Sequence, residues 1–280
     1  MTYGDGYRRS LWSQYGVRLL FAAIILIGGA VTYFCQTQTN PITGEKQRIS
    51  LSPDEEVQLG LQSAPEMVAE MGGEEAVNDP REQTVKGIGS QLAAALPNNP
   101  YRFDFHLLRD QKTVNAFALP GGQVFITEAL YSRLGNEAQL AGVLGHEIGH
   151  VVHRHGAQQI AHSQWYQSIV MATGVGSGDQ RAAALAQYVT QLRSLKYSRE
   201  DELQADQWGL KLMADVKFDP REMLRVMEIL KSLEGSSSGS EMMSTHPLPE
   251  SRIEQINAEL KKSYPNGVPA EFVKGKGLAR

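Results

Sequence analysis

The segment His146-Glu147-Ile148-Gly149-His150 brings two imidazoles and a carboxyl group together within about one helical turn. Residues four apart on an α-helix share a face, so His146 and His150 can direct their rings at one point. Imidazoles at this spacing are typical zinc ligands, and Glu147 beside them can take a proton from an attacking water. The spacing predicts a hydrolytic centre that uses a single Zn²⁺ per chain.

The motif requires a helix, and the surrounding sequence favours one. Asn136 can cap its first turn, and Gln139 follows at the spacing of a capping box. Apolar residues recur at helical spacing and predict a buried face: Leu140, Val143, Leu144, Ile148, Val151 and Val152. We expect the helix to end near Gly156.

A catalytic zinc needs a third protein ligand, and the motif helix does not supply it. His153 shares the correct face, but it lies about 10 Å along the axis from His146, too far to bind the same ion. Glu202 and Asp206 lie four residues apart, on one face of a long helix predicted over 182–208. One of these acids could bind the metal, while the other holds a ligating imidazole through its second ring nitrogen.

The composition of the 280 residues is that of a globular protein, with 41% hydrophobic and 21% charged residues. The length allows one large domain or two small ones. A net charge of −4 and the lack of a basic stripe argue against a nucleic-acid partner. The single cysteine, Cys35, excludes an internal disulfide and a cysteine-based zinc cluster.

The N-terminal region predicts a membrane anchor. Residues 19–35 form a mostly apolar stretch of 17 residues without a charge, just enough for a helix to cross a bilayer. The positive-inside rule then places residues 1–18 in the cytoplasm and the rest of the chain outside it, because three arginines precede the stretch: Arg8, Arg9 and Arg18. Two alternatives stay open, a signal-peptidase site at 28–30 and a lipidated Cys35.

The remaining chain divides into a polar linker (36–50), a metallopeptidase domain (51–262) and a C-terminal tail (263–280) that we expect to fray. Three helix starts share a capping residue, a following proline and an acid, and they predict helices over 53–71, 80–95 and 220–233. Alternating residues predict strands over 102–108, 115–119 and 123–127, and a last helix is expected over 249–262.

Two motifs together resemble the HtpX-like and CAAX-prenyl-protease family of zinc metallopeptidases, the gluzincin branch: the His-Glu-x-x-His segment and Ser198-Arg199-x-x-Glu202-x-x-Ala205-Asp206. The resemblance covers about residues 50–262 and is greatest to bacterial members with a soluble catalytic domain outside the cytoplasmic membrane. It implies an α+β, mostly helical, zincin-like fold with a small sheet beside the motif helix. It also implies that Glu202 is the third metal ligand and that Asp206 supports a ligating histidine.

Two further segments fit this resemblance. The first, Asn115-Ala116-Phe117-Ala118 with the following Leu-Pro-Gly-Gly, is similar to the family's edge strand, which would bind a substrate backbone as an added strand. The second is Thr245-His246-Pro247, followed by Arg252. His246 could donate a hydrogen bond to the tetrahedral oxyanion that forms during hydrolysis, or it could occupy the open zinc position at rest. Arg252 is expected to form a structural charge pair, and three histidines are expected to be surface or core residues: His106, His155 and His162.

These observations predict a zinc endopeptidase that cleaves unfolded or exposed protein segments. The resemblance implies a bacterial protein with its catalytic domain outside the cytoplasm and a role in protein quality control, and the apolar stretch 19–35 predicts a single pass through the inner membrane. One alternative is a zinc-containing chaperone or binding protein, against which an intact Glu147 argues. A prenyl-peptide processing enzyme is a further alternative, but it should need a multi-helix membrane chamber.

Overall fold

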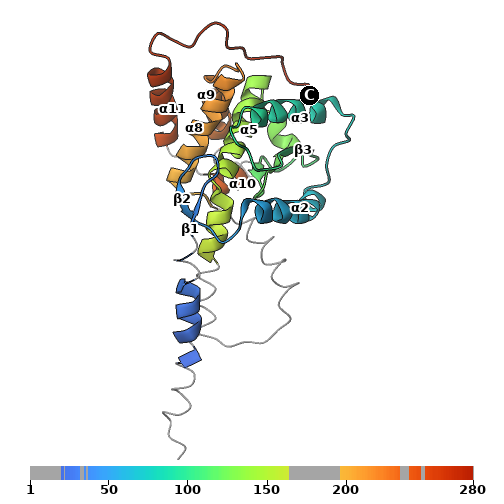
Figure 1. Cartoon of the computed structure of the whole chain (residues 1–280). Coiled ribbons are helices and arrows are strands. Elements are labelled where there is room, and N and C mark those ends of the chain that lie inside the picture. The colour runs from blue at the N-terminus through green and yellow to red at the C-terminus, as the bar shows by residue number, and fades with distance from the viewer. Residues whose placement is uncertain are drawn as a thin grey trace, which may run out of the picture.

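The structure is a computed structural model that describes residues 20–21, 23–31, 35, 37–163, 196–233, 240–246 and 250–279. Figure 1 shows a cluster of helices beside a small sheet, with the blue N-terminal helix pointing away from it. The predicted mostly helical α+β fold is confirmed. Helix α5 (Glu137–Val152) lies at the centre, where it contacts α3 (Pro80–Ala94), α8 (Arg199–Asp215), α9 (Glu222–Ser232) and strand β4 (Ala116–Ala118).

The sheet that lies next to α5 has three strands in the order β3-β5-β4. Strand β3 (Asp104–Leu108) runs parallel to β5 (Gln123–Thr127), and β4 (Ala116–Ala118) runs antiparallel to β5. All three lie within the predicted strands. The turn between β4 and β5 requires glycine at 121, where φ is +84° and a Cβ would lie 2.3 Å from the Cα of Val57.

Two predicted helices are confirmed, and a third begins late. Helices α2 (Pro53–Glu70) and α3 (Pro80–Ala94) start behind the side-chain caps Ser52 and Asp79. Helix α9 (Glu222–Ser232) begins two residues after the predicted start. The Asp219 carboxylate accepts from the backbone N of Arg221, which closes a short turn ahead of the helix instead of capping it. A short helix, α4 (Glu128–Tyr131), follows β5.

Helix α5 (Glu137–Val152) begins at the predicted cap, where the Asn136 side chain accepts from the backbone N of Gln139. The predicted end at Gly156 is wrong, because α5 stops at Val152 and a turn follows at residues 153–154. Arg154 adopts the left-handed conformation there, with φ of 59°. The chain is helical again over residues 155–163.

Helix α8 (Arg199–Asp215) carries the second acidic motif and confirms the final part of the helix predicted over 182–208, but that helix is not continuous. Residues 196–198 are not helical, and Ser198 starts α8 in a capping box with Asp201. The earlier part of that prediction lies outside the described residues. Helix α10 (Ser240–Thr245) follows, and α11 (Glu250–Ser263) agrees with the last predicted helix.

Helices α5 and α8 touch through their backbones at a seam of small residues. A Cβ on Gly149 would lie 2.7 Å from the Cα of Ala205, and one on Gly145 would lie 3.1 Å from the Cα of Gly209. No larger side chain fits between these turns without moving them apart. The seam therefore brings the face of α5 that carries the histidines against the face of α8 that carries Glu202.

Two segments expected to lack structure instead cover the ends of α5. Residues 36–50 contain an antiparallel pair, β1 (Thr37–Thr39) and β2 (Lys46–Arg48), instead of an open linker. Side chains of this segment bind carbonyls at and just after the end of α5: Asn40 Nδ2 donates to Val152 O at 2.7 Å and Gln47 Nε2 donates to His153 O at 2.8 Å. Unsatisfied carbonyls at a helix end favour such partners.

The C-terminal tail does not fray. It passes from α11 over the other helices toward α3 (Figure 1). Its backbone carbonyls accept hydrogen bonds from the N–H groups in the first turn of α5. Glu137 N donates to Lys276 O at 3.0 Å, and Ala138 N donates to Lys274 O at 2.9 Å. These bonds satisfy backbone groups that a helix start leaves open.

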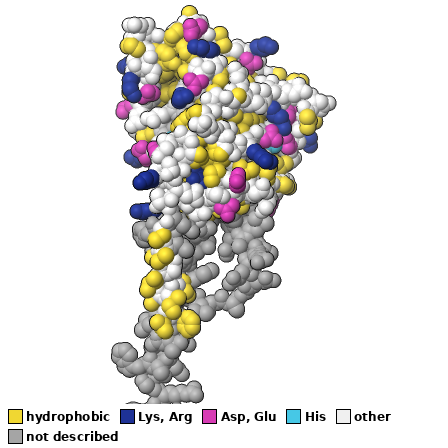
Figure 2. Space-filling model, in the orientation of Figure 1, with side chains coloured by type: hydrophobic (Ala, Val, Ile, Leu, Met, Phe, Trp, Pro, Cys, Tyr) yellow, Lys and Arg dark blue, Asp and Glu magenta, His cyan; other side chains and the backbone are white. Residues whose placement is uncertain are grey.

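In the part of the chain that the structure describes, no helix has both the length and the apolar character needed to span a membrane. The helical residues between 20 and 31 nevertheless expose several large apolar side chains, which form the yellow column in Figure 2: Leu20, Phe21, Ile24, Leu26, Ile27 and Val31.

Candidate metal centre

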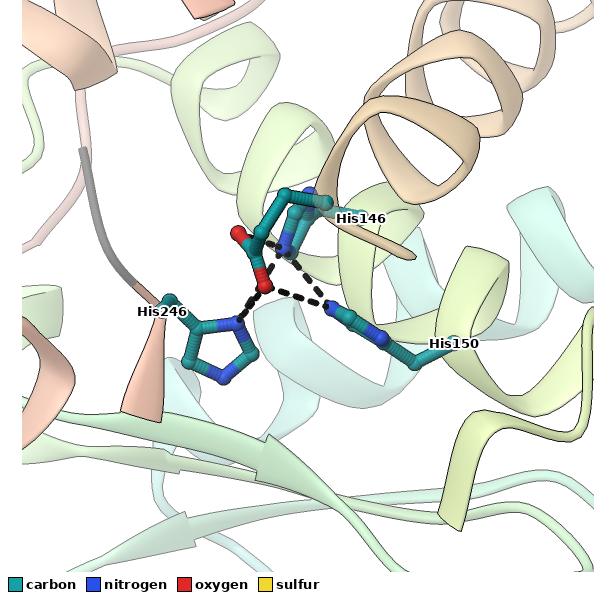
Figure 3. Close-up of side chains that lie close together, drawn as sticks. His146, His150 and His246 are labelled. Carbon is teal, nitrogen blue, oxygen red and sulfur yellow. Dashed lines mark hydrogen bonds and ion pairs between the residues drawn. The ribbon is translucent and has the colours of Figure 1, made fainter. Parts of the chain in front are cut away.

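Four buried side chains from three parts of the fold meet at one point. His146 and His150 come from α5, Glu202 from the first turn of α8, and His246 follows α10 directly. Figure 3 shows the three imidazole rings turned toward one another. Each residue offers one ligand atom, and all four atoms lie within 4.8 Å of one another. The structure thus brings the three predicted ligands together with His246, for which the open zinc position was one of two expected places.

The separations between these atoms suit a tetrahedral metal site. His146 Nε2 lies 3.1 Å from His150 Nε2 and 3.4 Å from His246 Nδ1. Glu202 Oε1 lies 3.5 Å from His150 Nε2 and 3.0 Å from His246 Nδ1. Nitrogen and oxygen ligands around a tetrahedral zinc lie about 3.3 Å apart, so these residues fit a metal ion.

The charges of the centre also call for a cation. Burial lowers the pKa of His146, but hydrogen bonds to Asp206 and Glu202 outweigh this effect and raise that pKa to about 9. Burial alone would raise the pKa of the Glu202 carboxyl, but the surrounding histidines hold it well below its usual range. Without a metal the cluster therefore takes up a proton, which a bound metal would displace.

The two acids of α8 have separate roles, as the resemblance implied. Glu202 faces the ligand atoms, whereas Asp206 lies behind them with its Oδ1 2.9 Å from Nδ1 of His146. An imidazole whose Nδ1 is bound to a carboxylate presents its Nε2 lone pair to a metal. Asp206 thus fixes the orientation of His146.

Arg252 of α11 ties both acids together. Its Nη1 donates to Glu202 Oε2 at 2.5 Å, and its Nε donates to Asp206 Oδ2 at 2.7 Å. The guanidinium is 2% exposed, so its charge pairs are buried. The predicted charge pair exists, and its partners are the two acids of the metal centre, Glu202 and Asp206.

Glu147 lies beside the ligand atoms and is completely buried. Neither of its carboxyl oxygens has a hydrogen-bond partner among the described residues. Burial raises the pKa of this carboxyl, while His246 and His146 oppose that rise. A desolvated carboxyl group whose Oε1 lies 3.9 Å from Nε2 of His246 suits the predicted role of general base.

Two neighbours of His150 were not predicted as parts of the site. His155 places its Nδ1 2.9 Å from Nδ1 of His150, and the Tyr197 ring stacks on that imidazole with 3.8 Å between ring centres. His155 is a buried residue, as expected, but it also contacts a predicted metal ligand. No sequence signal predicts this contact, because it depends on the turn at Arg154.

The other histidines lie outside the centre. His162 is exposed, and His106 is a core residue whose Nδ1 lies 2.8 Å from Glu74 Oε1. Glu74, Glu82 and His106 are close enough to share a cation. However, Nζ of Lys86 lies 3.2 Å from Glu82 and 3.6 Å from Glu74, so a side chain already supplies that charge.

Strand β4, predicted to bind substrate, lies at the edge of the sheet and contacts α5. Asn115 O accepts from Thr127 N, and Leu119 N donates to Gln123 O, so both residues use these groups toward β5. Because an antiparallel ladder alternates, the backbone groups of Ala116 and Ala118 point away from β5. The Phe117 ring stacks on Phe125 of the same sheet.

A His-Glu-x-x-His helix, a carboxylate from a second helix and a neighbouring small sheet define a metallopeptidase of the zincin type. Residues 79–260 match the family described as peptidase family M48. The chain belongs to this family and is an enzyme of the metallopeptidase class.

Two relatives illustrate this membership. The mitochondrial metalloendopeptidase OMA1 of Schizosaccharomyces pombe is 31% identical over 248 residues, which cover 87% of this chain and 72% of that protein. The beta-barrel assembly-enhancing protease of Escherichia coli is 30% identical over 248 residues, which cover 85% of this chain and 50% of that protein. The chain thus spans only about half the length of the bacterial relative.

Proposed function

We propose that this protein is a zinc-dependent endopeptidase that cleaves unfolded or exposed protein segments outside the cytoplasm, in protein quality control. The main support is the convergence of His146, His150 and Glu202 beside the buried carboxyl of Glu147, which has no hydrogen-bond partner among the described residues. Relatives named as a metalloendopeptidase and a protease agree with this activity. Zinc is favoured over harder cations because two or three of the ligand atoms are imidazole nitrogens.

In the proposed mechanism, the substrate backbone pairs with Ala116 and Ala118 and lies extended beside α5. When bound, the metal polarises the scissile carbonyl and acidifies the attacking water. Glu147 takes the proton of that water and then transfers it to the leaving amine. Backbone pairing discriminates little between side chains, so it selects exposed or unfolded segments more than a particular sequence.

The proposal is tested by removing and restoring the metal in the full-length protein. We expect about one zinc per chain by elemental analysis, loss of hydrolysis of reduced casein after chelation, and recovery on adding Zn²⁺, because three protein ligands form the centre. Circular dichroism after chelation is the control for folding. Hydrolysis that continues in metal-free protein would contradict the proposal.

We further propose that His246 occupies the fourth ligand position at rest and moves aside for substrate, where it donates to the oxyanion. The short distances from its Nδ1 to Glu202 and His146 support the resting position. The distance of 3.9 Å from its Nε2 to Glu147 Oε1 supports a place beside the reacting groups.

Replacing His246 should separate these two roles. We expect His246→Ala to slow casein hydrolysis by about 10²–10³-fold, because a donor to the oxyanion is lost. The same variant should bind a small hydroxamate more tightly, because the fourth position is open, and titration of the zinc-loaded protein measures this. Weaker or unchanged hydroxamate binding would exclude the resting position.

We also propose that residues 19–35 anchor the protein in a bacterial inner membrane, with 1–18 in the cytoplasm and the domain in the periplasm. The exposed apolar side chains between residues 20 and 31 support an apolar environment for this segment. Extraction of membranes with alkaline carbonate tests the anchor, since release of the full-length protein into the supernatant would exclude it.

A further inference from the structure

A chain of hydrogen bonds leads from the metal centre to His155. Nδ1 of His150 lies 2.9 Å from Nδ1 of His155, and Nε2 of His155 lies 3.0 Å from Oε1 of Gln204 on α8. His155 is 1% exposed, so water does not compete for these bonds. The other nitrogen of His150, Nε2, faces the remaining ligand atoms.

These contacts determine where the protons lie. The neighbours of His155 Nε2 are acceptors, Gln204 Oε1 and, at 3.5 Å, Asp201 Oδ1, so this nitrogen carries a proton. Neutral His155 then has a lone pair on Nδ1, which accepts the Nδ1 proton of His150. His150 in this tautomer presents the lone pair of its Nε2 to the metal centre.

The turn at Arg154 brings His155 into this position. A left-handed conformation is unfavourable for a residue that carries a side chain. Three interactions hold the turn: Arg154 Nε donates to Glu56 Oε1 at 2.7 Å, and its Nη atoms donate to Leu51 O at 2.6 Å and Gln38 Oε1 at 3.2 Å. The buried arginine thus keeps the chain folded back against the end of α5.

We propose that His155 is a positioning residue for the metal centre, because it accepts the Nδ1 proton of His150 and fixes the tautomer and ring orientation of that ligand. The inference rests on the proposed metal centre and extends it to the second histidine. Asp206 supports His146 with a charged group, whereas His155 supports His150 with a neutral one. The support of His150 therefore adds no further negative charge to a site that already buries Glu147, Glu202 and Asp206.

The test compares zinc affinities of full-length variants, measured by competition with a chromophoric chelator. We expect His155→Phe to bind zinc about 10–100-fold more weakly, because the ring is kept but the acceptor is lost. His155→Asn should recover most of the affinity, because its Oδ1 can accept the same proton. His153→Phe is the matched control, since His153 is similarly buried on the same turn but contacts no ligand atom among the described residues.

Two readouts report the geometry directly. The Co²⁺-loaded His155→Phe protein should show altered d–d absorption bands, which His155→Asn restores and His153→Phe leaves unchanged. In the wild-type protein, which needs no variant to fold, imidazole ¹⁵N signals should show His150 protonated at Nδ1 and His155 protonated at Nε2.

Three results would overturn the inference. The first is a His155 that is protonated at Nδ1. The others are equal zinc affinity of wild type and His155→Phe, or equal losses of zinc affinity in His155→Phe and His153→Phe. A wild-type chain that binds no metal would instead refute the proposed metal centre itself.

Discussion

Glu147→Gln should slow peptide hydrolysis by about 10²–10⁴-fold, because an amide cannot accept the proton of the attacking water. The zinc content should stay at the wild-type level, since Glu147 supplies none of the four ligand atoms. The variant should also be at least as stable as wild type, because the carboxyl group that it replaces is buried without a hydrogen-bond partner in the described structure. Casein hydrolysis, elemental analysis and urea unfolding measure the three effects.

Glu82→Gln is the matched control for this prediction. Glu82 is also fully buried, but it lies on α3 and accepts from the backbone N of Leu107 at 2.7 Å, away from the metal centre. Its replacement should leave the rate of hydrolysis per folded molecule unchanged. Equal activity of wild type and Glu147→Gln would show that Glu147 is not the general base.

Arg252→Met should destabilise the metal-free protein by about 3–5 kcal/mol, because the carboxylates of Glu202 and Asp206 would lose their buried counter-ion. Methionine keeps much of the side-chain length, so the loss reports the charge more than the packing. Bound zinc should recover part of the loss, because the cation also neutralises Glu202. The measurement is urea unfolding of the full-length chain with and without the metal.

Arg225→Met provides the contrast. Arg225 pairs with Glu228 across an exposed helix face, with both side chains about 60% exposed. A pair so accessible to water contributes little to stability, because water and salt screen the two charges. If both arginine variants lost equally little stability, the buried pairs of Arg252 would not support the centre as described.

Local sequence signals predicted most of the elements that position the site. The caps at Ser52, Asp79 and Asn136 act within a single helical turn, so they can be read from neighbouring residues. Spacing of four residues likewise placed His146 with His150, and it selected Glu202 and Asp206 from a run of acids. The family resemblance then assigned the two acids to the roles that their geometry supports.

The missed features depend on contacts between distant residues. The support of His150 by His155 needs the turn at Arg154, and that turn is held by Glu56, about 100 residues earlier in the chain. The coverage of both ends of α5 comes from residues near 40 and near 275, whose polar sequences indicate only loops. Arg252 was expected to pair with an acid, but only the fold shows that it bridges two acids of the centre.

The glycine seam between α5 and α8 has a consequence for how this enzyme can vary. Two backbones in direct contact set the spacing between the helices that present the histidines and Glu202, independently of how the rest of the interior is filled. Interior side chains elsewhere can therefore exchange for others of similar volume with little effect on ligand spacing. Even one added methyl group at Gly149 would push the two helices apart, and with them the histidines and Glu202. We therefore expect the enzyme to tolerate substitution least at Gly149, although this residue has no side chain.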